Sequence, residues 1–338
     1  MGRRLRLWET DKIYSCTERT IDRQFLFRPD HNPRNRLLRW DCPQNALDPD
    51  NDIIPKPSII NIIGSAIVRA LKKHPVDIYW FEGNINHLHD SVGVIGGNLD
   101  NVSRFKQTCN SLIAKGLKDS IDREGHAFGA PFRSTPCISD ASAEQQLFYS
   151  VTNVVKDGLV EKVSQSPFFT TYRHLAQGEP LEFWWIDWAR YWKAGGKANK
   201  RLRVKDFLRW GSFELTVLPD WKDLTEQQRR TRFRKGVRDL EEMYAQQRKD
   251  QQRNAMGTAR LFELDPRDRP RNPKQSARQP LCHASSKKKR VEFARQWRDF
   301  VNEHRKASAD FLNGYWEREF PEGSFRPPIL KIYTSSRL

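Results

Sequence analysis

The 338-residue sequence has few cysteines, and they are far apart. No two of them form a Cys-x-x-Cys pair, so neither a disulfide framework nor a zinc knuckle is expected. We expect all five to be reduced thiols. They are Cys16, Cys42, Cys109, Cys137 and Cys282.

Apolar stretches long enough to cross a membrane are also missing. The sequence has no run of about 18 apolar residues. The first six residues, Met-Gly-Arg-Arg-Leu-Arg, lack the apolar segment of a signal peptide. We therefore expect a cytoplasmic protein without a membrane partner.

Acidic residues are outnumbered, with 42 Asp+Glu against 59 Lys+Arg and a net charge of +17. The excess lies in the second half. Residues 1–170 contain 22 Lys+Arg and 20 Asp+Glu, whereas residues 171–338 contain 37 and 22. Such an excess indicates a polyanionic partner, and nucleic acid fits it better than a membrane surface does.

Hydrophobic periodicity predicts a mixed α+β fold, and 37% hydrophobic residues with 11 tryptophans suffice for at least one core. The predicted order of strands and helices suits an antiparallel sheet with helices on one face. Two charged helices are predicted in the second half. The predicted strands start at residue 13 and cover 76–81 and 87–94, and the predicted helices cover 58–73, 101–117, 139–160, 226–253 and 287–311.

The helix predicted at 139–160 has the clearest end signals. Ser142 and Gln145 have the spacing of a capping box, and Gly158 is placed to end the helix. An apolar stripe runs along one side of this helix, which leaves another side for polar residues.

Four residues are candidates for an active site, three as metal ligands and one as a nucleophile. His87 and His89 project to the same face of a strand, and Tyr149 and Asn153 lie four residues apart on one face of a helix. Two imidazoles and an amide oxygen suit Mg²⁺ or Mn²⁺ with open coordination positions. The ordinary alternatives are hydrogen-bonded histidines and a half-buried helical tyrosine.

Several short segments occur in an order that is itself informative. Asn-His-Leu-His at 86–89 precedes Leu-Phe-Tyr-Ser-Val-Thr-Asn at 147–153. Both resemble motifs of the single-tyrosine HUH transposases, specifically the REP-associated tyrosine transposases of bacteria. The resemblance spans roughly residues 1–180. Further segments that agree with it are 13–19, 23–28, 125–133 and 157–160.

The resemblance implies a ferredoxin-like catalytic domain at residues 1–180. The charge excess and the predicted helices indicate a basic, mainly helical region at 181–338, which we expect to bind DNA. The resemblance also implies that His87, His89 and Asn153 hold Mg²⁺ or Mn²⁺ and that Tyr149 is the nucleophile. The activity would be cleavage and rejoining of single-stranded DNA at hairpins or palindromes, through a 5′-phosphotyrosine and a free 3′-OH. A nucleoid-associated monomer or homodimer is expected.

Two positions depart from the family pattern, and other functions remain open. Asp90 stands where relatives usually have an aliphatic residue, and Val154 replaces a common proline.

The alternative functions are those of a domesticated palindrome-binding protein that no longer transposes, an HUH replication initiator or relaxase, and a plain nucleic-acid-binding protein.

Cations near the site segments are candidates for phosphate contacts. The predicted DNA-binding residues are Arg19, Arg23, Arg123, Arg133 and Lys156. Denser basic clusters occur at 229–235 and 287–290. The aromatic run at 183–192 is predicted to pack in a core, with base stacking as the alternative.

Overall fold

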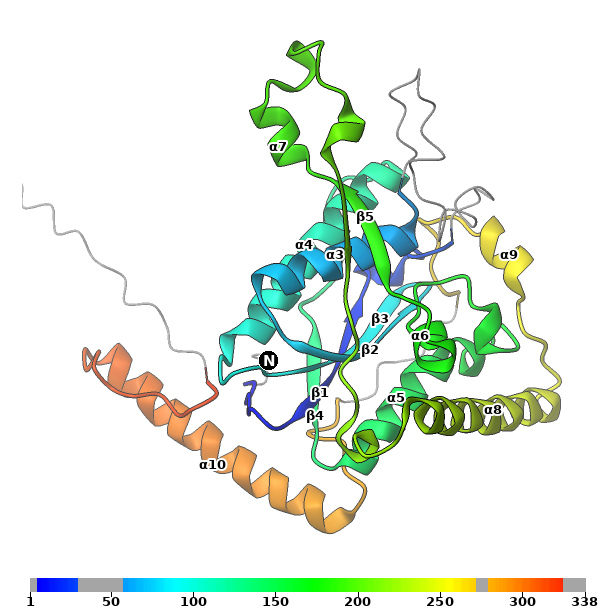
Figure 1. The fold of residues 1–338 in the computed structure, drawn as a ribbon. Coiled ribbons are helices and arrows are strands. Elements are labelled where there is room, and N and C mark those ends of the chain that lie inside the picture. Colours follow the sequence, from blue (N-terminus) through cyan, green and yellow to red (C-terminus); the bar gives the residue numbers. More distant parts are fainter. Residues whose placement is uncertain (1–4, 30–56, 272–278, 325–338) are drawn as a thin grey trace, which may run out of the picture.

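A computed structural model describes residues 5–29, 57–271 and 279–324 (Figure 1). Its centre is an antiparallel four-stranded sheet with the strand order β2-β3-β1-β4. Along the chain the elements follow the β-α-β-β-α-β order of ferredoxin-like folds, so the predicted fold class is confirmed. The strands are β1 (Ile13–Arg19), β2 (Asp77–Asn84), β3 (His87–Gly93) and β4 (Arg133–Cys137).

Two helices, α3 (Ile59–Lys73) and α4 (Asp100–Ile121), cover one face of the sheet. The hydroxyl of Ser58 accepts a hydrogen bond from the backbone N–H of Asn61 and so caps α3. Side chains alternate along each strand, so Leu88 on β3 points into this layer while its two neighbours point to the opposite face.

Helix α5 (Asp140–Lys156) lies against the opposite face of the sheet. Helices therefore cover both faces and not one face as predicted, because the apolar stripe of α5 is buried against this second face. Helix α5 begins where the predicted range begins, with Ser139 as its N-cap, and its reciprocal capping box joins Ser139 to Ser142. The predicted box between Ser142 and Gln145 is therefore wrong. Gly158 follows the end of the helix at φ +71°, as predicted.

A charged cluster is buried between the sheet and α4. The Lys106 ammonium contacts the carboxylates of Glu18 and Asp90, and all three side chains are fully buried. Burial alone would lower the pKa of Lys106, but the two carboxylates more than offset this and raise it. Burial raises the pKa of Glu18 to about 7. Asp90 is thus the partner of a buried lysine.

Lys106→Met is expected to lower the free energy of unfolding by about 3–5 kcal/mol, because it leaves buried carboxylates without a countercharge. Urea unfolding measures the loss. It should be smaller at pH 5 than at pH 8, since protonation of Glu18 removes one uncompensated charge. Lys115→Met, at an exposed position of the same helix, is the control. Equal stability of the two variants would show that the ion cluster contributes nothing.

The chain beyond residue 180 packs onto the ferredoxin-like core. Strands β5 (Glu182–Ile186) and β6 (Leu208–Ser212) form an antiparallel pair. The Asn61 side chain joins this pair to α3, because its amide donates to the Trp184 carbonyl at 2.7 Å and accepts from the Trp184 N–H at 3.1 Å. The domain boundary predicted near residue 180 stays a prediction.

The remaining helices include the two charged ones predicted from sequence. Helix α8 (Glu226–Asp250) packs on α5 through Phe233, whose ring stacks on Phe148 with centroids 6.0 Å apart. Helix α10 (Lys287–Leu312) matches the second predicted range closely. The short helices are α6 (Tyr172–Gln177), α7 (Trp188–Lys193), α9 (Thr258–Glu263) and the 3₁₀ segments Ile21–Arg23, Val163–Gln165, Gly196–Ala198, Val204–Phe207 and Pro219–Trp221.

The expectations of no membrane-spanning segment and of reduced cysteines can be compared with the described residues. Within those ranges, none of the helices has the length and apolar content needed to span a bilayer. Four of the cysteines, Cys16, Cys109, Cys137 and Cys282, are buried free thiols. The fifth, Cys42, lies outside the described residues.

Candidate active site

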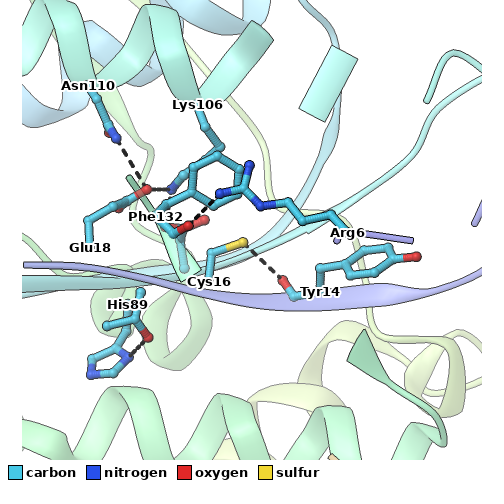
Figure 2. Close-up of polar contacts among 10 residues, drawn as sticks. Arg6, Tyr14, Cys16, Glu18, His89, Lys106, Asn110 and Phe132 are labelled. Carbon is cyan, nitrogen blue, oxygen red and sulfur yellow. Dashed lines mark hydrogen bonds and ion pairs between the residues drawn. The ribbon is translucent and has the colours of Figure 1, made fainter. Parts of the chain in front are cut away.

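Strand β3 and helix α5 bring the four predicted site residues together. The rings of His87 and His89 meet edge to face, with centroids 4.8 Å apart. The Tyr149 ring meets His89 in the same way at 5.9 Å. The amide oxygen of Asn153, one turn further along α5, lies 3.1 Å from His87 Nε2. Figure 2 shows His89 on one side of the sheet and Lys106 with Glu18 on the other.

The orientation of the Asn153 amide follows from its neighbour Asn84. The Asn84 side-chain oxygen accepts a hydrogen bond from the backbone N–H of Ile85 at 2.6 Å. A backbone N–H can only donate, so the Asn84 amide nitrogen faces the other way and donates to Asn153 Oδ1 at 2.7 Å. Asn153 therefore presents its oxygen to His87.

The tautomer of His87 follows from Asn86 by the same reasoning. The Asn86 amide nitrogen donates to the Arg23 carbonyl at 3.1 Å, which turns its oxygen towards His87 Nδ1 at 2.8 Å. Nδ1 must then carry the proton, and Nε2 of the neutral ring has a lone pair. Two acceptors, His87 Nε2 and Asn153 Oδ1, thus face one another at 3.1 Å.

Both histidines are in environments that keep them neutral. Burial, followed by the charge of Arg19, lowers the pKa of His87 to about 4. Burial and the neighbouring His87 lower the pKa of His89 well below its ordinary value. Thr17 Oγ1 lies 3.2 Å from His89 Nδ1 and orients that ring. Neutral imidazoles are the form that ligates metal ions.

A cleft of about 610 Å³ opens beside the histidines and includes Tyr149 and His89 in its lining. Its walls come from β1, β4 and α5, and also from residues more than 100 positions further along the chain. Gln279 donates through its amide to the Ser134 carbonyl at 2.8 Å, and the His283 backbone N–H donates to the Pro136 carbonyl at 2.8 Å. The segment that includes Gln279 and His283 therefore extends the edge of the sheet and completes the cleft.

Cations gather at this cleft. Arg19, Arg23 and Arg133 line it, and burial together with the charges of the other two lowers the pKa of Arg19. The Lys156 ammonium lies 4.3 Å from the centre of the Tyr149 ring. Like charges repel, so a cluster of guanidinium groups is stabilised when an anion enters.

Arg123, the fifth predicted DNA contact, is placed differently. Its guanidinium donates to the side-chain oxygen of Gln24 and to the His126 carbonyl. It does not belong to the lining of the cleft formed by the described residues. Its role in DNA binding stays a prediction.

Sequence reasoning missed the residues that orient the site. Asn84, Asn86 and Thr17 orient the proposed ligands. Their signal was local, since Asn86 directly precedes the His-x-His motif and the other two are on strands paired with β3. Gln279 and His283 had no such signal, because only the tertiary fold brings them to β4.

Comparison with known proteins yields limited similarity. No protein-family model and no curated protein matches the chain. A solved structure of a REP-associated tyrosine transposase bound to a REP hairpin is similar to part of it. The two chains are 20% identical, the match covers 54% of this chain and 90% of the other, and the TM-score is 0.35. These values do not place the chain in that family.

Proposed function

We propose that this protein is a metal-dependent single-stranded DNA endonuclease and strand-transferase that uses Tyr149 as its nucleophile. The observation that carries the proposal is the pair of acceptors, His87 Nε2 and Asn153 Oδ1, which face each other at 3.1 Å beside a tyrosine in a cleft lined by arginines. Facing lone pairs repel unless a cation lies near both of them.

The donor set fits Mg²⁺ or Mn²⁺. Adjacent ligands of an octahedral ion at about 2.1 Å are about 3 Å apart, which matches the separation of His87 Nε2 and Asn153 Oδ1. No three His, Cys, Asp or Glu side chains gather as a metal site anywhere in the described residues. A three-ligand site at this position therefore needs the Asn153 amide oxygen together with His87 and His89. When bound, the ion would polarise the scissile phosphate as a Lewis acid.

In the proposed step the Tyr149 oxygen forms a bond to phosphorus and the bond from phosphorus to the 3′ oxygen breaks. The phenolic proton is lost and the departing 3′ oxygen gains one. One phosphodiester replaces another, so rejoining needs no ATP. Arg19, Arg133 and Lys156 would offset the negative charge of the phosphate, since all three lie at the cleft or against the Tyr149 ring.

A single strand is the substrate that the position of Tyr149 favours. Tyr149 is half-buried on the wall of the cleft, and a flexible strand can bend into such a cleft more easily than a stiff duplex can. The motif resemblance adds the expectation of a hairpin or palindrome beside the cleavage site. We propose transposition as the biological role, and cleavage at a plasmid origin instead would indicate a replication initiator or relaxase.

The test is incubation with end-labelled single-stranded hairpin DNA and Mn²⁺, followed by a denaturing gel. We expect a covalent protein–DNA adduct that a chelator prevents. If the protein binds hairpins from its own genome tightly and forms no adduct with any of them, it is a nucleic-acid-binding protein and the proposed activity is wrong.

A further inference from the structure

A helical arm extends from the body of the protein between β5 and β6. We define the arm as residues 187–207, which include α7 and two 3₁₀ segments. Figure 1 shows α7 beyond α3, at the end of the molecule away from α5 and α8. The arm is therefore remote from the proposed catalytic cleft.

The arm has its own small core and a firm base. Ile186, Tyr191 and Phe207 form a buried cluster, and the Tyr191 and Phe207 rings meet edge to face with centroids 5.4 Å apart. At the base, Phe183 packs so closely on α3 that a β-carbon at Gly64 would lie 2.2 Å from its ring. The arm is a folded element held in place, which reduces the entropy cost of binding through it.

Two tryptophans of α7 face outward from this core. Trp188 and Trp192 are four residues apart and so lie on the same side of the helix. They are 49% and 55% exposed. Each ring meets the buried Tyr191 ring edge to face, with centroids 5.6 and 5.1 Å apart. The prediction that the whole aromatic run packs in a core is therefore wrong for these two residues, because only the first part of the run is in the strand that meets α3.

The arm that carries the tryptophans is rich in cations. The arm contains seven Lys+Arg and two Asp+Glu, and Asp187 is already used as the N-cap of α7. None of the exposed cations of the arm forms an ion pair with a carboxylate of the described residues. The exposed cations are Arg190, Lys193, Lys197, Lys200, Arg201 and Arg203.

We propose that the arm binds the single-stranded DNA that flanks the cleaved hairpin, with unpaired bases stacked on Trp188 and Trp192. Exposed aromatic rings among cations are the combination that binds single strands, because the cations contact phosphates and the rings stack on bases that a duplex keeps covered. The identity of the DNA as substrate rests on the proposed function. The binding surface itself depends only on the arm.

The experiment measures binding apart from cleavage. The full-length Tyr149→Phe protein in EDTA is titrated into fluorescein-labelled thymidine 30-mer, and anisotropy gives the Kd. Trp188→Ala/Trp192→Ala in that background is expected to raise the Kd about tenfold or more. Trp316→Ala is the matched control, because this tryptophan is 53% exposed outside the arm and next to Glu317. Circular dichroism checks that each variant is folded.

The outcomes separate the arm from the active site. An unchanged Kd in the double variant would overturn the proposal, as would an equal loss of affinity for a 30-base-pair duplex or tighter arm-dependent binding of a uridine 30-mer. In the Tyr149-containing protein, the double variant should cleave a minimal hairpin normally and a hairpin with long flanks less efficiently. If no protein forms an adduct while thymidine 30-mer binding still depends on the arm, only the proposed nuclease function fails.

Discussion

Tyr149→Phe is expected to abolish the covalent protein–DNA adduct and to reduce strand cleavage by at least about 1,000-fold, because the proposed nucleophile is the oxygen that this change removes. The ring itself stays, so its contacts with His89 and Lys156 remain and the fold should be unchanged. Densitometry of the adduct on denaturing gels measures the effect. Mass spectrometry of digested wild-type adduct should place the DNA on the peptide that contains Tyr149.

Tyr172→Phe is the matched control for this prediction. Tyr172 is also half-buried on a helix, but its ring packs against Phe233 and lies outside the cleft lining formed by the described residues. Adduct yield should be unchanged in this variant. Persistence of the adduct in Tyr149→Phe would mean that another side chain attacks the phosphate.

His87→Ala is expected to have the second largest effect, with loss of Mn²⁺ binding and a fall in cleavage of about 1,000-fold, equivalent to about 4 kcal/mol of transition-state stabilisation. The change removes one of the two acceptors that face each other at 3.1 Å and leaves Asn153 Oδ1 without the neighbour that completes a cation site. Mn²⁺ affinity is measured directly by electron paramagnetic resonance, which requires no activity.

Two further variants make the metal prediction sharper. Asn84→Ala keeps all proposed ligands but frees the Asn153 amide to rotate, so Mn²⁺ should bind about 10- to 100-fold more weakly. His74→Ala removes a histidine at the C-cap of α3 and should leave Mn²⁺ affinity unchanged. Wild-type affinity in His87→Ala would contradict the assignment of the facing acceptors as a metal site.

Local patterns in the sequence were enough to predict most of the framework of the site. Strand periodicity placed His87 and His89 on one face, and helical spacing placed Tyr149 and Asn153 on one side of α5. Both predictions hold in the structure because each depends only on the repeat of a single element. The capping box of α5 was predicted one turn too late, since Ser139 and Ser142 both have the chemistry of an N-cap and the fold selects the first.

Contacts between distant residues could not be derived in this way. Lys106 on α4 has no local feature that predicts Glu18 and Asp90 as its partners. Gln279 and His283 reach the cleft through hydrogen bonds to β4, which is more than 140 positions earlier in the chain.

The sequence by itself determined the secondary structure around the site, the identity of the candidate nucleophile and ligands, and the basic character of the second half. The tertiary structure decided which atoms of those ligands face each other, what completes the cleft, and which tryptophans of the aromatic run are exposed. The physical reason is that periodicity records which face of an element is apolar, whereas burial and hydrogen-bond direction depend on what the rest of the chain places against that face.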